Sequence, residues 1–174
     1  MKNGQYKEIT ELGLGKEING IYFSTMNRIG ETLKKGCHIA EPFAVVIKGD
    51  SKMVVPQGEL EKNDYADQLR IVCHFLQANA VILFCEASQW TGTEHQRLEV
   101  IKKRGTTHGH PKSKNVVMAT IETKGKTIIG LAEVEEKGNK RMMKAFVWDV
   151  QDTPELGKAN FMSLLNNDKE EDDE

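Results

Sequence analysis

The chain has 174 residues, of which 24 are Lys or Arg, 26 are Asp or Glu and 39% are hydrophobic. This composition predicts one globular domain. No apolar run approaches the roughly 18 residues of a membrane-spanning helix, and no secretion signal is recognisable, so we expect a cytoplasmic protein without a membrane partner. The cysteines Cys37, Cys73 and Cys85 form no C-x-x-C pair, which excludes a disulfide scaffold and a zinc knuckle made of cysteines alone.

Acidic residues are concentrated at the end of the chain. Residues 168–174 contain six acids and one lysine, so residues 1–167 carry a net charge of +3 although the whole chain carries −2. Because like charges repel and this run has no apolar residue to bury, we expect residues 166–174 to form a disordered acidic tail. We expect residues 1–23 to form an N-terminal arm outside the core, and residues 24–165 to form a single domain.

The first elements of the domain are a helix and a hairpin. Apolar residues recur at positions 26, 29 and 33 and a glycine stands at position 36, which predicts a helix over residues 24–35. Two β-branched runs, residues 42–48 and 51–56, are separated by Gly49 and Asp50 and predict a hairpin. Both faces of the first run are apolar, so we expect it to lie inside the sheet.

The second half of the domain begins with a helix over residues 60–76 and a continuous apolar strand over residues 80–85. Residues 91–114 are polar and predict a long loop, with a helical turn near residues 94–103. Three alternating runs, 116–122, 127–134 and 144–150, then predict a meander. The order of elements predicts an α+β fold, with a mixed, mainly antiparallel sheet and two helices packed on one face.

Part of this pattern resembles a group of small phage and bacterial proteins. The resemblance covers roughly residues 40–134 and depends on the apolar strand ending in Glu86-Ala87 with Trp90 nearby, and on the loop that re-enters the sheet through residues 110–114. In that group the strand typically ends Ser-Glu-Ala-Trp. Here Ser88 and Gln89 separate Ala87 from Trp90. The resemblance implies a phage or mobile-element accessory protein and carries no activity with it.

The long loop is the main candidate for a binding site. It is the densest basic stretch of the chain, and Gly105 and Gly109 would let backbone N–H groups approach an anion. Trp90 offers an aromatic face for stacking on a base. The alternative is a solvated surface loop. The predicted binding residues are Trp90, Arg97, Lys102, Lys103, Arg104, His108, His110, Lys112 and Lys114.

A metal-dependent reaction is the second interpretation of the same loop. His108 and His110 resemble the His-x-His pair of JAB/MPN-type isopeptidases, which implies zinc held by these histidines while Glu86 handles the proton. The chain departs from that family because Ile121 stands where an aspartate is required. For Glu86, an ion pair with a lysine or arginine of the loop is the non-catalytic alternative.

Because no complete catalytic constellation is found, we expect binding without catalysis and without a cofactor. The sequence predicts a stoichiometric binding module for a host protein, a nucleotide signal or a nucleic acid, and the phage resemblance suggests a role in counter-defence. A zinc-dependent hydrolase and a virion structural protein are the alternatives. The chain is also compatible with a homo-oligomer.

Overall fold

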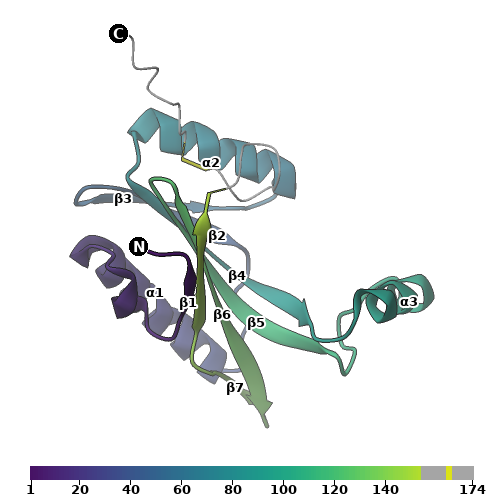
Figure 1. Ribbon diagram of the computed structural model, residues 1–174. Coiled ribbons are helices and arrows are strands. Elements are labelled where there is room, and N and C mark those ends of the chain that lie inside the picture. The colour runs from purple at the N-terminus through teal and green to yellow at the C-terminus, as the bar shows by residue number, and fades with distance from the viewer. Residues whose placement is uncertain (154–163, 166–174) are drawn as a thin grey trace.

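The computed structural model describes residues 1–153 together with Leu164 and Leu165. In this part of the chain a short 3-10 helix, η1 (Ile9–Leu12), accompanies three helices: α1 (Lys16–Lys34), α2 (Lys62–Leu76) and α3 (Glu94–Arg104). The strands are β1 (Gly4–Tyr6), β2 (Phe43–Lys48), β3 (Ser51–Pro56), β4 (Ala80–Trp90), β5 (Ser113–Thr123), β6 (Lys126–Lys137), β7 (Lys140–Met143) and β8 (Val147–Asp152). The predicted α+β class is confirmed (Figure 1).

The strands form one sheet in the order β1-β8-β6-β5-β4-β2-β3, with β7 paired to β6. The predicted hairpin is β2 and β3, and the predicted meander strands correspond to β5, β6 and β8. All the strand pairs of the described residues are antiparallel, so the prediction of a mixed sheet was wrong. The reason lies in where α2 places β4. β4 runs in the same direction as β3 but lies beside β2, which runs in the opposite direction.

Each face of the sheet has its own helix. Along β2, Val45 and Ile47 pack in the cluster that contains α1, whereas Ala44 and Val46 pack in the cluster that contains α2. The prediction that both helices lie on one face was therefore wrong. The central strands are apolar on both faces, so each face needs a layer that shields it from water. In Figure 1 the sheet separates α1 from α2.

The N-terminal segment belongs to the core, contrary to the expectation of a separate arm. β1 pairs with β8, and Ile9, Leu12 and Leu14 are buried. α1 begins at Lys16 instead of near residue 24. Gly20 made this first part of the helix hard to recognise in the sequence. In the structure Gly20 is exposed, and a Cβ atom there would contact no other residue.

Leu164 and Leu165 complete the α2 side of the core. Both are buried, and their backbone N–H groups donate to the carboxylate of Glu122 at 2.8 and 3.1 Å.

The predicted acidic tail, residues 166–174, lies outside the described residues. Within the described residues no helix has the length and apolar character needed to cross a membrane.

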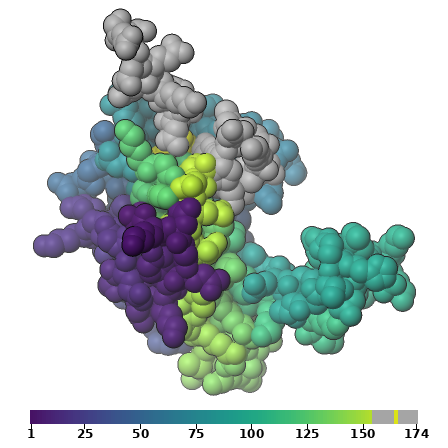
Figure 2. All heavy atoms as spheres, viewed as in Figure 1, coloured from purple at the N-terminus to yellow at the C-terminus, as the bar shows by residue number. Residues whose placement is uncertain are grey.

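Two central strands extend beyond the rest of the sheet. β4 pairs with β5 as far as Trp90 and Ser113, but β2 accompanies β4 only to Phe84 and β6 accompanies β5 only from Val116. The ends of β4 and β5 therefore form a two-stranded ribbon with α3 at its tip. We call residues 88–115 the basic arm and the remainder of the described chain the body; the basic arm projects away from the body (Figures 1 and 2).

Candidate functional site

The basic arm contains all nine residues predicted to bind, and its helix α3 replaces the expected helical turn. The helix begins after Thr93, whose side-chain oxygen accepts the backbone N–H of Gln96 while the Gln96 side chain accepts the N–H of Thr93. This reciprocal capping box and the left-handed Gly105 define the two ends of the helix. No residue of α3 is buried. The helix is therefore held by local interactions rather than by the core.

Trp90 fastens the base of the basic arm. Its indole N–H donates to the Thr93 carbonyl at 2.9 Å, and its ring lies against His110 with the ring centroids 5.1 Å apart. Gly92 is packed tightly here, since a Cβ atom would come 3.0 Å from both the indole ring and the Lys112 side chain. Two of the predicted binding residues, Trp90 and His110, thus contact each other within the basic arm.

Three of the predicted cationic residues have polar partners in the structure. The Arg97 guanidinium lies 3.0 Å from Glu94, and Lys112 Nζ donates to the Gln96 side chain at 2.7 Å. Lys114 Nζ donates to Glu133 of β6 at 3.3 Å, which links the ribbon to the body. These three side chains help to hold the basic arm in place.

The remaining four predicted residues are available for a partner. Lys102, Lys103, Arg104 and His108 are exposed, and their side chains make no hydrogen bond or ion pair with any residue that the structure describes. The first three form the last turn of α3, where positive charge also complements the helix dipole. We call these three residues, Lys102, Lys103 and Arg104, the tip cluster.

The charge of the basic arm is opposite to that of the rest of the chain. Residues 88–115 contain six Lys or Arg and two Glu, a net charge of +4, so all other residues together carry −6. Among the described contacts, no acidic side chain pairs with the tip cluster. The two glutamates of the arm are farther along α3, Glu94 at its other end and Glu99 in its middle. The arm therefore presents a local positive charge that the small net charge of the chain conceals.

The outer face of α3 also carries two apolar residues that sequence analysis did not select. Leu98 is 53% exposed and Ile101 is 36% exposed. They stand three positions apart, so they lie on the same face of the helix. Their spacing is a signal that could have been found in the sequence if the segment had been treated as a helix rather than a loop.

Glu86 lies at the base of the ribbon, in the body. Its carboxylate accepts hydrogen bonds from the buried Arg141 guanidinium at 2.9 Å and from the Ile39 backbone N–H at 2.9 Å, and lies 2.8 Å from His38 Nδ1. Burial alone would raise the pKa of Glu86, but the hydrogen bonds from Arg141, His38 and Ile39 outweigh it and hold that pKa below its usual value. Glu86 is therefore held as an anion.

The partners of Glu86 differ from those expected. The sequence-based alternative was a lysine or arginine of the long loop, but the cation is Arg141 of β7. Arg141 is 55 positions from Glu86 in the sequence, and the fold brings the two side chains together. For His38, no signal in the sequence connects it with a glutamate 48 positions away.

The structure does not bring Glu86 together with His108 and His110. Glu86 stands four residues before Trp90 on β4, about 13 Å along an extended strand, whereas the two histidines lie beyond Trp90 in the basic arm. Across residues 1–153, 164 and 165 there is no group of three or more His, Cys, Asp and Glu side chains placed to share a metal ion. The arrangement that the zinc interpretation requires is therefore not assembled.

Comparison with known proteins gives no further assignment. No protein-family model, no curated protein and no solved structure matches this chain.

Proposed function

We propose that this protein is a stoichiometric binding module that contacts the phosphate backbone of a nucleic acid through its basic arm. The observation that carries this proposal is the tip cluster: Lys102, Lys103 and Arg104 are exposed and without ion-pair partners among the described residues, on an arm that projects from the body. Lys and Arg groups that replace condensed counterions on phosphates supply most of the affinity of sequence-independent binding.

The shape of the basic arm favours a polymer over a free nucleotide. Sites for small ligands are concave and enclose most of the ligand, whereas α3 has no buried residue and lies at the end of a projecting ribbon. A projecting basic element can instead follow a backbone or enter a groove from outside. The resemblance to phage proteins supports a setting in an infected bacterial cell, with counter-defence as the proposed role.

The test is the affinity of the full chain for labelled single-stranded and duplex oligonucleotides of mixed sequence, measured by fluorescence anisotropy over a range of salt concentrations. The variant Lys102→Glu/Lys103→Glu/Arg104→Glu should lose most of the affinity. Neutralising the cluster with Lys102→Gln/Lys103→Gln/Arg104→Gln should reduce the slope of log K against log salt by about two to three, because each phosphate contact contributes about one unit.

A matched control uses three exposed lysines of the body. Lys48→Glu/Lys52→Glu/Lys124→Glu changes the net charge by the same amount but lies outside the basic arm. This control variant should bind nearly as well as the original chain. Equal losses in the two charge-reversal variants, or salt-independent binding, would contradict the proposed contact.

A protein partner is the second candidate, and the exposed Leu98 and Ile101 favour it. Two apolar residues on one helix face, bordered by the cations Arg97 and Lys102, are complementary to an acidic surface with an apolar centre. The variant Leu98→Ser/Ile101→Ser separates the two candidates: it should weaken a protein contact strongly while leaving the slope of nucleic-acid binding against salt unchanged.

A further inference from the structure

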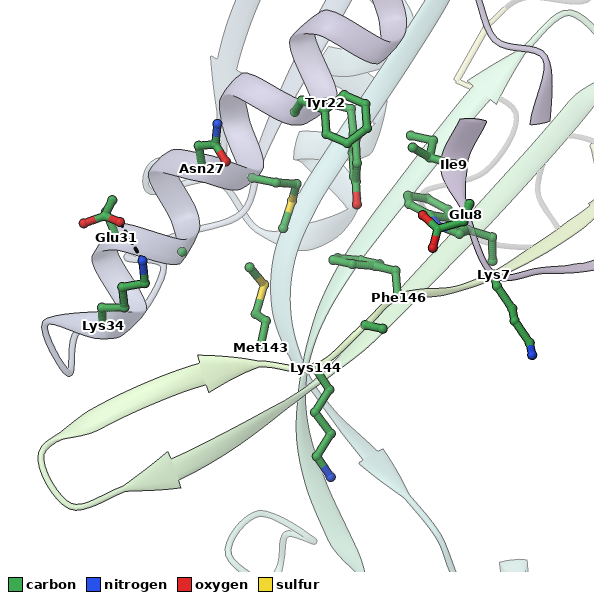
Figure 3. Close-up of a pocket in the computed structure, with 15 residues that line it drawn as sticks. Lys7, Glu8, Ile9, Tyr22, Asn27, Glu31, Lys34, Met143, Lys144 and Phe146 are labelled. Carbon is green, nitrogen blue, oxygen red and sulfur yellow. Dashed lines mark hydrogen bonds and ion pairs between the residues drawn. The ribbon is translucent and has the colours of Figure 1, made fainter. Parts of the chain in front are cut away.

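A pocket lies on the α1 side of the body, away from the basic arm. It has a volume of about 450 Å³ and opens between α1, the segment before η1 and the connection from β7 to β8. Figure 3 shows Tyr22 of α1 facing Phe146, and Met143 beside them. This volume falls within the range of sites that hold small organic molecules.

The floor of the pocket is aromatic. Phe146 stacks on the buried Trp148 with centroids 5.2 Å apart, and Tyr22 meets both rings edge-on, 6.0 Å from Phe146 and 5.2 Å from Trp148. Met26 and Met143 also line the pocket, together with the apolar residues Ile9, Phe23 and Ala145. Aromatic rings favour edge-to-face or offset contact with a further ring, and unbranched thioether side chains adapt to its outline.

One polar group of the pocket, the Tyr22 hydroxyl, reaches solvent and has no hydrogen-bond partner among the described residues. Tyr22 as a whole is only 6% exposed. In Figure 3 the hydroxyl points into the space beside Phe146. Burial, followed by the nearby charge of Glu8, raises the pKa of Tyr22 well above its usual value, so the group remains a neutral hydroxyl. A ligand in the pocket can donate a hydrogen bond to it or accept one from it.

A glycine of α1 forms part of the pocket lining. Gly30 lies inside α1, where glycine is less favourable than alanine because it loses more backbone freedom. Its φ is not positive, so the backbone does not require glycine. A Cβ atom at this position would meet only Met143 Cε, at 3.9 Å. A longer side chain at this position would extend into the pocket that Gly30 lines.

Two of the lysines at the rim are paired with glutamates. Lys34 pairs with Glu31 at 2.9 Å, and Lys144 pairs with Glu135 at 2.9 Å and with Glu133 at 3.3 Å. The Lys7 and Lys144 side chains point away from the space between Tyr22 and Met143 in Figure 3. A charged ligand would have to be desolvated at the aromatic floor, and an anion would also be repelled by Glu8.

We propose that this pocket binds a small, uncharged aromatic molecule that carries one hydrogen-bonding group, with its ring on the floor formed by Phe146 and Trp148 and its polar group at the Tyr22 hydroxyl. The site is independent of the basic arm and of the nucleic-acid contact proposed above. It would give the body a ligand of its own.

The probes are phenol, which has the required hydroxyl, and benzene, which has the same ring without it. The full chain is labelled with ¹³C at the methionine methyl groups, and each probe is titrated to about 10 mM, the range in which so small a ligand is expected to bind. The Met26 and Met143 signals should shift and saturate. The Met53 signal, from the exposed strand β3, should stay in place.

Two variants of α1 form a matched pair. Gly30→Leu fills the pocket and should abolish the saturable shifts, whereas Gly20→Leu introduces the same side chain at an exposed glycine of the same helix and should leave them unchanged. Tyr22→Phe retains the ring and removes only the hydroxyl. It should weaken phenol binding about five-fold, the effect of one uncharged hydrogen bond, and leave benzene binding unchanged.

Three outcomes would overturn the proposal. The first is the absence of saturable shifts at Met26 and Met143 with phenol. The second is that Gly30→Leu binds as well as Gly20→Leu. The third is that phenol and benzene respond equally to Tyr22→Phe, which would remove the hydroxyl from the site even if Gly30→Leu failed to fold.

Discussion

The body and the basic arm are built on the same two strands, β4 and β5, but they are held in different ways. In the body Phe84 and Ile121 are completely buried between layers that contain both long helices. In the arm the same strands continue as a ribbon, and the helix at its tip buries nothing. The body is stabilised by removal of apolar surface from water, whereas the arm depends on a capping box, a tryptophan contact and a few polar pairs.

This difference separates stability from binding. A residue in the body is constrained by its neighbours in the core, while most residues of the arm can be exchanged without a cost to the core. Exposed residues of the arm are therefore free to be selected for a partner. The tip cluster and the apolar pair Leu98 and Ile101 are found in this part of the chain.

The largest expected effect is loss of a core aromatic. Trp148 is 1% exposed, and its ring covers Gly130, which has no room for a side chain. Trp148→Ala should lower the free energy of unfolding by about 3–5 kcal/mol, measured by urea unfolding followed by circular dichroism. Trp90→Ala, in the basic arm, should lower it by less than about 1 kcal/mol. Similar losses in both variants would mean that the arm and the body unfold as one unit.

A smaller loss is expected at the junction of the two regions. Glu86→Gln leaves the buried Arg141 with only the more distant carboxylate of Glu136, 3.8 Å away, and should lower the free energy of unfolding at pH 7 by about 1–3 kcal/mol. The folded-state pKa of Glu86 is lowered, so its contribution is present above the unfolded-state pKa and is lost as the pH falls below about 4.5. The original chain should therefore lose more stability than Glu86→Gln on acidification.

The control for this junction is Glu94→Gln in the basic arm. Glu94 also pairs with an arginine, but both side chains are solvent-exposed, so the change should cost less than about 0.5 kcal/mol. Urea unfolding at several pH values measures both variants. A pH dependence that is identical for the original chain and Glu86→Gln would contradict the role given to this carboxylate.

A local effect is expected from the capping residue of α3. Thr93→Ala removes the side-chain oxygen that accepts the Gln96 N–H and should destabilise the helix by about 1 kcal/mol. Hydrogen exchange should become faster at the α3 amides and remain unchanged at β5 amides inside the body. Thr93→Ser preserves the acceptor and should exchange like the original chain. Faster exchange throughout the body would show that the two regions are coupled.

Removal of the arm itself is also expected to have only a small effect on stability. Replacing residues 91–112 by Asn-Gly closes the ribbon between Trp90 and Ser113 with a two-residue hairpin turn. The free energy of unfolding should change by less than about 1 kcal/mol, because no buried residue is lost from α3 and loop length has a weak effect. Nucleic-acid affinity should disappear. Retained affinity would place the contact in the body.

Local patterns predicted most of the elements. The hairpin of β2 and β3, the helix α2 and the strand β4 follow from short-range periodicity and turn residues. The hairpin and α2 lie close to their expected positions, whereas β4 continues five residues beyond the predicted end at residue 85. The arrangement of the helices could also have been anticipated. Residues 43–47 are apolar on both faces, and a strand with two apolar faces needs cover on both.

Long-range contacts account for what was missed. β1 is short and contains no apolar pattern, so its place beside β8 depends on a partner at the other end of the chain. The Glu86 cluster joins residues from three separate segments, and Arg141 was not recognisable as a buried residue because a charged side chain normally lies in water. The basic residues of the arm were predicted, but the spacing of Leu98 and Ile101 acquires meaning only in a helix.

The pairing of β1 with β8 has a consequence for the order in which the chain folds. β1 pairs with a strand that is synthesised nearly 150 residues after it, and such distant pairings are formed slowly. Until then Ile9, Leu12 and Leu14 have no completed core to enter, and the edge of β8 is also unavailable. These apolar residues therefore stay exposed until β8 has been synthesised, which is the interval in which chaperones and aggregation compete for them.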